Sequence, residues 1–341
     1  MDAIKIDGLT KKYKDVVAVD NLSLSVHKGE LFSLLGVNGA GKTTTIKMLS
    51  CLTQPTGGDA FLNGISICKD TAAVKSIIAV SPQETAVAPG LSVRENLELM
   101  CGVHGFTKNK QNTKIAELTE LLGLESVIKK KAGKLSGGWQ RRLSIAMALI
   151  SEPEILFLDE PTLGLDVLAR SDLWDLIRSL KGKVTIILTT HYMEEASDAD
   201  YVIILDSGKI VAEGTPLDLK NRYTGDYINL YGISESDAKS LGVRYKAISG
   251  GYRIFVKSTG EISTLIAANP SLFADCEVTK GKMDDVFLAV TGKKMSPDTY
   301  ECMKILGKDK VLARINLAGA LFLSIVAVLP LVLGKLIPSF G

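Results

Sequence analysis

The sequence predicts an α/β fold with a mainly parallel sheet, followed by a small α+β domain and a hydrophobic C-terminal helix. Up to about residue 216, short apolar runs such as 30–36, 155–158 and 184–190 alternate with segments whose apolar residues recur at helical spacing. Buried strands that alternate with helices are typical of a parallel sheet covered on both faces. A longer helical stretch over about 93–150 predicts a helical subdomain inserted into this alternation.

The composition is that of a packed globular protein, with 46% hydrophobic and 23% charged residues. A net charge of +2 gives no overall field that would attract nucleic acid, so no nucleic-acid partner is expected. Five cysteines without repeated spacing and three widely separated histidines argue against a disulfide framework and a metal cluster. The first residues contain no apolar stretch, so we expect no signal peptide and a cytoplasmic N-terminal part.

Composition changes along the chain divide it into three units. Residues 1–218 form the α/β domain, and a polar stretch separates them from a unit over 225–292 that reads strand, helix, strand, strand, helix, strand, helix. Residues 293–341 form a basic linker followed by 20 uncharged residues, 315–334, which as a helix would span about 30 Å, the thickness of a bilayer core. A membrane-embedded tail is the favoured interpretation, with the basic side cytoplasmic, and a buried helix of a larger domain is the alternative.

A glycine-rich segment, Gly36–Thr43, matches the pattern G-x-x-x-x-G-K-[ST] of the phosphate-binding loop. It follows a predicted strand and opens a predicted helix, so its backbone N–H groups and the helix N-terminus would surround an anion. Lys42 would reach the β- and γ-phosphates, and the Thr43 hydroxyl would bind Mg²⁺. The alternative is a glycine-rich turn with an incidental lysine.

Two acids end a second apolar strand. Asp159 would hold Mg²⁺, partly through water, and Glu160 would orient the attacking water as a general base. Alone, this pattern would more often be a strand that ends in two solvated acids. Its position about 115 residues after the phosphate loop favours the functional interpretation.

Two further polar positions lie at the ends of predicted elements. Ser136 in LSGGWQ precedes a helix, which its side chain can cap and whose free N–H groups form another anion site. His191 follows the strand 184–190, where it could contact a γ-phosphate, although a single histidine at a strand end is usually structural.

Taken in order, these motifs resemble those of the nucleotide-binding subunits of ABC transporters, over about residues 3–218. Segment 36–43 looks like Walker A, 155–159 like Walker B, LSGGWQ like the ABC signature, 164–166 like the D-loop and His191 like the H-switch. Trp139 departs from the usual Gln, Met or Glu of the signature, and Val37 departs from a common proline of Walker A. Neither change removes a predicted phosphate contact.

The resemblance implies a P-loop NTPase fold of the ABC type, with ATP and Mg²⁺ as cofactors and ATP hydrolysis coupled to transport. It implies that Glu160, His191 and Gln83 are catalytic and that Asp166 belongs to the D-loop. The implied ATP-binding residues are Tyr13, Gly36, Asn38, Gly39, Ala40, Gly41, Lys42, Thr43 and Thr44. The implied Mg²⁺ ligands are Thr43, Gln83 and Asp159, and the implied contacts to the nucleotide of a partner domain are Ser136, Gly137, Gly138 and Gln140.

The same resemblance implies the partners. Nucleotide-binding domains of this family meet head to tail, so a homodimer or a heterodimer is expected, docked on integral membrane permease subunits at the cytoplasmic face of the cell membrane. The unit over 225–292 is similar to the C-terminal domain of the drug-export branch, which favours an exporter with a separate ABC-2-type permease. The tail resembles a transmembrane segment of the Sec-type translocon channel, or is a fusion or truncation product.

Three alternatives stay open from the sequence. A soluble ABC-type ATPase of translation or DNA repair usually carries two such domains or a long coiled coil, and this chain shows neither. A nucleotide switch that does not hydrolyse ATP is disfavoured by the presence of Glu160 and His191. An import motor has the same ATP chemistry, so the motifs do not separate it from an exporter.

Overall fold

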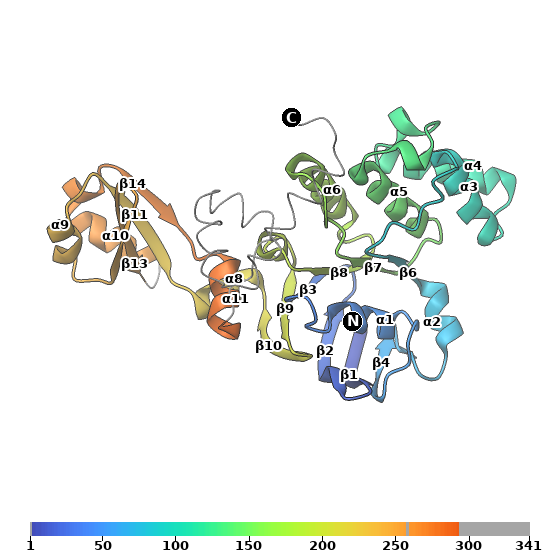
Figure 1. The fold of residues 1–341 in the computed structure, drawn as a ribbon, viewed down its shortest axis with the longest axis horizontal. Helices are drawn as coiled ribbons and strands as arrows, with labels where there is room; N and C mark the ends of the chain where they lie inside the picture. The colour runs from blue at the N-terminus through green and yellow to red at the C-terminus, as the bar shows by residue number, and fades with distance from the viewer. Residues whose placement is uncertain (1, 257–258, 293–341) are drawn as a thin grey trace, which may run out of the picture. The chain divides into compact units, whose positions relative to one another are not determined.

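The computed structural model describes residues 2–256 and 259–292 (Figure 1). The predicted membrane tail, 315–334, and its likeness to a Sec-type segment lie outside the described residues. Among the helices that are described, none combines the length and the apolar character needed to cross a bilayer.

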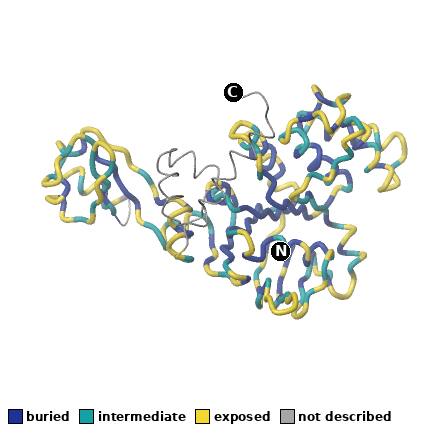
Figure 2. Tube along the Cα trace, in the orientation of Figure 1, coloured by how far each residue is buried: buried dark blue, intermediate teal, exposed yellow. Residues whose placement is uncertain are grey.

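The predicted parallel sheet is present, with one antiparallel strand at its edge. Five strands run parallel and β10 pairs antiparallel with β9. Every residue of β3, β7 and β8 is buried, which Figure 2 shows as a continuous dark trace. The strand order is β10 (Lys209–Gly214), β9 (Tyr201–Asp206), β3 (Leu31–Leu35), β8 (Thr185–Thr190), β7 (Ile155–Asp159) and β6 (Ile78–Ser81).

A second, antiparallel sheet was not anticipated from the sequence. Its two long strands carry register shifts, so their apolar residues lose the strict alternation that marks a half-buried strand. The order is β2 (Val16–His27), β1 (Asp2–Tyr13), β4 (Gly57–Leu62) and β5 (Ile65–Ser66).

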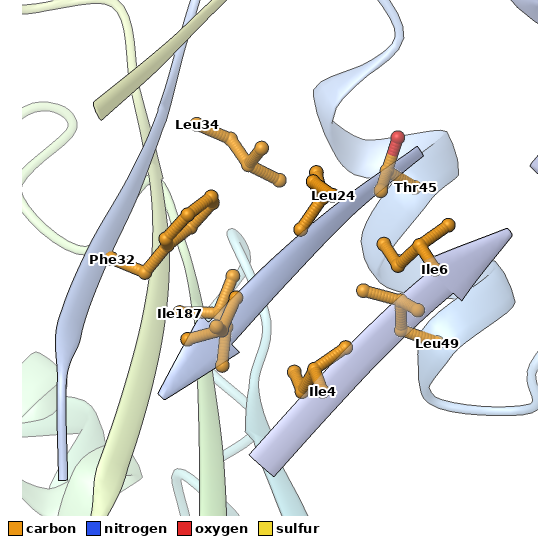
Figure 3. Close-up of a pocket in the computed structure, with 9 residues that line it drawn as sticks. Ile4, Ile6, Leu24, Phe32, Leu34, Thr45, Leu49 and Ile187 are labelled. Atoms are coloured by element: carbon orange, nitrogen blue, oxygen red, sulfur yellow. The ribbon is translucent and has the colours of Figure 1, made fainter. Parts of the chain in front are cut away.

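The two sheets enclose a shared apolar core with helix α1 (Lys42–Leu49). Figure 3 shows Phe32, Leu34 and Ile187 of the six-stranded sheet facing Ile4, Ile6 and Leu24 of the antiparallel sheet, with Leu49 of α1 beside them. This packing fixes the start of α1 relative to the end of β3.

The predicted helical subdomain is present over 93–149. It contains α3 (Val93–Val103), α4 (Lys108–Leu121) and α5 (Gly137–Leu149), which pack against one another. The remaining helices of the α/β part are α2 (Thr71–Ile77), α6 (Val167–Leu180), α7 (Met193–Ala196) and α8 (Pro216–Tyr223).

The elements predicted over 225–292 occur in the predicted order. A four-stranded antiparallel sheet, β12-β13-β11-β14, carries its apolar core with α9 and α10. The last helix, α11, packs against α8 and α7. The bounds are β11 (Asp226–Tyr231), α9 (Glu235–Ser240), β12 (Tyr245–Ile248), β13 (Gly251–Val256), α10 (Thr259–Ala268), β14 (Cys276–Thr279) and α11 (Met283–Thr291).

Candidate functional site

The glycine-rich loop lies between the end of β3 and the start of α1, pressed against two neighbouring strands. A Cβ atom at Gly36 would lie 2.6 Å from the carbonyl oxygen of Leu205, and one at Gly41 would lie 2.5 Å from that of Ala18. Gly41 also has φ +106° and Gly39 has φ +83°, a region that other residues rarely adopt. The loop therefore needs glycine for close approach at two positions and for backbone conformation at two.

Lys42 curls back over the loop that precedes it. Its side chain is buried, and Nζ donates hydrogen bonds to the carbonyl oxygens of Gly36 at 2.8 Å and Val37 at 3.3 Å. Gly41 stands at the N-cap position of α1 without a capping side chain. The first turn of the helix thus presents its N–H groups beside a lysine ammonium, the arrangement that attracts phosphate.

The other predicted loop residues occupy the same turn. Ala40 is buried, and its carbonyl oxygen accepts a hydrogen bond from Gly208 at 3.1 Å. Asn38 and Gly39 are exposed, whereas Thr43 and Thr44 are half-buried at the start of α1.

Asp159, at the end of β7, lies beside the start of α1. Its Oδ1 accepts hydrogen bonds from Thr43 Oγ1 at 3.2 Å and from Thr189 Oγ1 at 2.6 Å. The Thr189 hydroxyl in turn accepts the N–H of Glu160 at 2.9 Å. Thr189 was not predicted as a site residue, and it joins the two acids from the neighbouring strand.

The residues Thr43 and Asp159 fit a magnesium ion by their chemistry. Mg²⁺ binds oxygen, commonly through one or two carboxylates together with phosphate oxygens and water. Within residues 2–256 and 259–292, no group of three or more His, Cys, Asp or Glu side chains could hold a metal. The donors present therefore suit an ion that takes most of its ligands from a phosphate group and water.

Glu160 connects the loop to His191. Its Oε1 lies 3.2 Å from Lys42 Nζ and its Oε2 lies 3.0 Å from His191 Nδ1. Burial disfavours the ionised carboxylate, but the hydrogen bond with His191 and the charge of Lys42 outweigh burial, so the pKa of Glu160 lies below its usual value. Glu160 is therefore ionised at neutral pH.

A side-chain network links the buried Glu195 to His191 through the partly exposed Arg170, which lies 3.9 Å from Glu195. Glu195 accepts hydrogen bonds from the hydroxyls of Thr162 and, at 2.6 Å, Thr190. The guanidinium of Arg170 lies 4.0 Å from the centre of the Tyr192 ring, which is 4.2 Å from that of His191. Sequence reasoning missed this network, because an acid in a helical segment such as MEEA is ordinarily a surface residue.

The signature segment opens α5, away from these contacts. Ser136 occupies the N-cap position, but its hydroxyl makes no capping hydrogen bond, so the predicted cap is wrong for this structure. Gln140 is held within its own chain, by Leu135 O at 3.1 Å and by Thr85 Oγ1 at 3.5 Å. A Cβ atom at Gly138 would lie 3.0 Å from the Cβ of Ala169, so the signature backbone packs closely on α6.

The structure thus assembles part of the predicted site. The phosphate loop, Asp159, Glu160 and His191 form one hydrogen-bonded cluster. Among the described residues, no hydrogen bond or ion pair joins that cluster to Ser136, Gly137, Gly138 or Gln140.

Three other predicted residues have separate positions. Gln83 is exposed, and its main-chain carbonyl accepts a hydrogen bond from Arg141. Asp166 caps α6 by accepting the N–H of Ala169 at 2.9 Å. Tyr13 is 45% exposed, and Lys11 Nζ lies over its ring, 5.0 Å from the ring centre.

Three family models match parts of the chain. A model described as ABC transporter matches residues 19–163. Shorter stretches match models described as an AAA domain, over 131–196, and an anticodon binding domain, over 274–318.

Curated relatives extend the similarity over most of the chain. The daunorubicin resistance ATP-binding protein DrrA3 of Streptomyces coeruleorubidus is 36% identical over 314 residues, which cover 85% of this chain and 96% of that protein. The Nod factor export ATP-binding protein I of Rhizobium etli is 36% identical over 308 residues, which cover 86% and 95%.

Solved structures share the fold. An ATP-binding subunit of an ABC transporter, 28% identical, aligns with a TM-score of 0.58 over 65% of this chain and 93% of that one. The ATP-binding cassette MJ0796, in a dimeric post-hydrolysis state bound to ADP and Pi, is also 28% identical, with a TM-score of 0.57 over 62% and 98%. The predicted ABC-type P-loop fold and the resemblance to ABC transporter ATP-binding subunits of the drug-export branch are confirmed.

Replacing two loop glycines separates backbone strain from close approach. Gly41→Ala combines a positive φ with a Cβ atom 2.5 Å from the Ala18 oxygen, whereas Gly39→Ala, with no heavy atom within 4 Å, carries only the φ cost of about 1–2 kcal/mol. We expect Gly41→Ala to lose binding of a fluorescent ATP analogue and to lower the free energy of unfolding by more than Gly39→Ala. Equal losses in urea titrations of the two variants would contradict this interpretation of the loop.

Thr189→Val tests the hydroxyl that joins the two acids. The change keeps the shape but removes the shorter of the two hydrogen bonds to Asp159 Oδ1 and leaves only that from Thr43, so we expect a loss of about 1–3 kcal/mol in stability and slower ATP turnover. Thr189→Ser should restore turnover. Thr185→Val, which removes a hydroxyl bonded to Gly29 N at the other end of β8, should affect stability alone. If Thr185→Val and Thr189→Val slow turnover equally, the hydroxyl acts only through folding.

Proposed function

The chain belongs to the ABC transporter ATP-binding proteins and is an ATPase, and on this premise we propose that it is the motor subunit of an exporter that acts with a separate ABC-2-type permease. The observation that carries the proposal is the cluster of Lys42, Glu160, His191, Thr43 and Asp159 at one sheet edge. The relatives named for drug resistance and Nod factor export match this chain over nearly their whole length, which favours export.

We propose the following roles for this chain's residues. The loop over 36–43 surrounds the triphosphate with N–H groups, and Lys42 adds a positive charge at the phosphates. Thr43 and Asp159, with Gln83, hold Mg²⁺, which supplies charge neutralisation of the phosphates. Glu160 orients the attacking water, and His191 fixes Glu160 through their hydrogen bond. Tyr13 stacks on the adenine ring.

The signature residues are proposed to act on the nucleotide of a second ATP-binding domain. They lie in α5, without a bond to the phosphate cluster of their own chain, so a homodimer or heterodimer would complete each site. The dimeric state of the related cassette with ADP and Pi supports this arrangement. Phosphate release would then remove the charge shared by the two domains and favour opening.

We further propose that the motor works at the cytoplasmic face of the cell membrane, on integral membrane permease subunits and without nucleic acid. In this proposal residues 1–218 are the ATP-binding domain, 225–292 an accessory domain, and 293–341 the basic linker and membrane tail. A soluble ATPase of translation or repair is not favoured by the relatives, which are exporter subunits by name.

Glu160→Gln tests the catalytic assignment. The amide keeps the size of the side chain but cannot accept a proton, so we expect ATP turnover to fall by about 10²–10⁴-fold while ATP binding is retained. The control is Glu154→Gln, at a half-exposed side chain that pairs with Lys28 on the surface. Unchanged turnover in Glu160→Gln would remove Glu160 from the mechanism.

Purification of the tagged full chain from native membranes tests the permease. We expect a protein with several membrane spans to co-purify, and Glu84→Lys, at an exposed position next to Gln83, to release it. Glu213→Lys makes the same charge change at an exposed position of β10 and should leave the complex intact. Recovery of ribosomes or DNA in place of a membrane protein would favour the soluble ATPase.

A further inference from the structure

The last residue of β6 and the segment that follows it run antiparallel to α5 and are bonded to it at three levels. Ser81 Oγ lies 3.0 Å from Ser144 Oγ, the Arg141 guanidinium donates to the carbonyl oxygens of Pro82 and Gln83, and Thr85 Oγ1 donates to Gln140 Oε1 at 3.5 Å. Ser144 lies three residues after Arg141 and four after Gln140, so each of these two residues shares a face of the helix with Ser144. Helix α5 and β6 lie in contact (Figure 1).

Arg141 is the strongest of these connections. The residue is 4% exposed, and its two terminal nitrogens bond two successive main-chain oxygens. Burial lowers the pKa of Arg141, and the negative charge of nearby Asp159 opposes that shift. A buried cation is costly unless its donors are satisfied, so these two carbonyl bonds hold the loop as much as they hold the arginine. Lysine lacks the planar fork and cannot make both bonds in this geometry.

A second buried side chain holds the far end of the same loop. Asn96 of α3 is fully buried, its Oδ1 accepts the N–H of Ala88 at 2.8 Å, and its Nδ2 donates to the carbonyl oxygens of Ala88 at 3.1 Å and Ser92 at 2.9 Å. The main chain of 82–88 is therefore fixed at both ends to the helical subdomain, while the Gln83 and Glu84 side chains are exposed.

We infer that Arg141 is a positioning residue that fixes the main chain of Gln83 to the helix that carries the signature, so that Gln83 and Ser136 move as one body. Ser136 lies five residues before Arg141, about 7.5 Å along a rigid helix. A displacement of the loop over 82–88 is thereby transmitted to the residues proposed to contact the nucleotide of the second domain. This inference rests on the proposed function in one respect, since it takes Gln83 to be a Mg²⁺ contact.

The neighbouring arginine offers a matched control. Arg142, also in α5, donates a hydrogen bond to the main-chain oxygen of Leu122 at 3.2 Å. It pairs with Asp172 at 3.3 Å, and its guanidinium lies over the Trp139 ring. It therefore connects α5 to the same subdomain and to α6, and among the described residues no hydrogen bond or ion pair joins it to the loop over 82–88. Its loss should affect folding without affecting Gln83.

The test is a double-mutant cycle in the full chain, measured as the Mg²⁺ concentration that gives half-maximal ATP turnover. We expect Gln83→Ala and Arg141→Met each to raise that concentration about tenfold, the effect of one lost hydrogen-bonded contact, and Arg141→Lys to raise it by less. In the Gln83→Ala background, Arg141→Met should add less than about twofold, because both changes remove the same contact. Arg142→Met should leave the Mg²⁺ dependence unchanged in both backgrounds.

A second measurement does not depend on activity. We expect Arg141→Met to speed cleavage after the exposed Glu84 by a glutamate-specific protease, with little change in amide hydrogen exchange of the β3, β7 and β8 strands, and Arg142→Met to leave the rate of that cleavage unchanged. If Arg141→Met does not fold, Arg141→Lys serves in the same measurements.

The outcomes distinguish the inference from the proposed function. Independent, multiplicative effects of Arg141→Met and Gln83→Ala, or an unchanged rate of cleavage after Glu84 in Arg141→Met, would overturn the inference alone. No effect of Gln83→Ala on the Mg²⁺ dependence would overturn the proposed role of Gln83 and, with it, the inference.

Discussion

The candidate site depends on the parallel pairing of β3, β8 and β7. Their register places Leu35 beside Thr190 and Asp159 beside Thr189, so the three strands end at one edge of the sheet. The phosphate loop leaves β3 there, both acids leave β7 there and His191 leaves β8 there. Since a parallel sheet brings the carboxyl ends of its strands together, residues more than 100 positions apart become neighbours without further adjustment. The fully buried strands hold this edge rigid.

Burying charge at that edge requires that each charged group has a partner. Lys42 has two loop carbonyls and Glu160, Glu160 has Lys42 and His191, and Asp159 has two hydroxyls. A buried ion that loses one partner is strongly destabilising, so these groups constrain one another's positions. The same argument applies to Glu195, which is buried and accepts hydrogen bonds from Thr162 and Thr190. Arg170, near Glu195, lies over the Tyr192 ring, which contacts the ring of His191.

Sequence reasoning reached the parts of this arrangement that are local. A glycine-rich turn, an acid at the end of an apolar strand and a helical run are each readable within about ten residues, and the parallel sheet followed from their alternation. Thr189, Glu195 and Arg141 were missed because their partners come from other elements, and nothing in their own segments marks them. The antiparallel sheet was missed because its register shifts disturb the alternation of apolar residues. The Ser136 cap was predicted from residue type, but the structure gives its hydroxyl no capping bond.

The loop over 82–88 connects the six-stranded sheet, which carries the phosphate loop and both acids, to the helical subdomain, which carries the signature. It begins at β6, which pairs with β7 and so with the acids, and its main chain is bonded to α5 and α3 of the helical subdomain. A loop bonded only to the sheet would hold Gln83 still when the subdomain moves. A loop bonded mainly to the subdomain carries Gln83 with it, so a shift of α5 would change the proposed Mg²⁺ contact of Gln83 and the position of the signature together. The buried side chains of Arg141 and Asn96 favour the second arrangement, because breaking their bonds to the loop would leave unsatisfied polar groups in the interior.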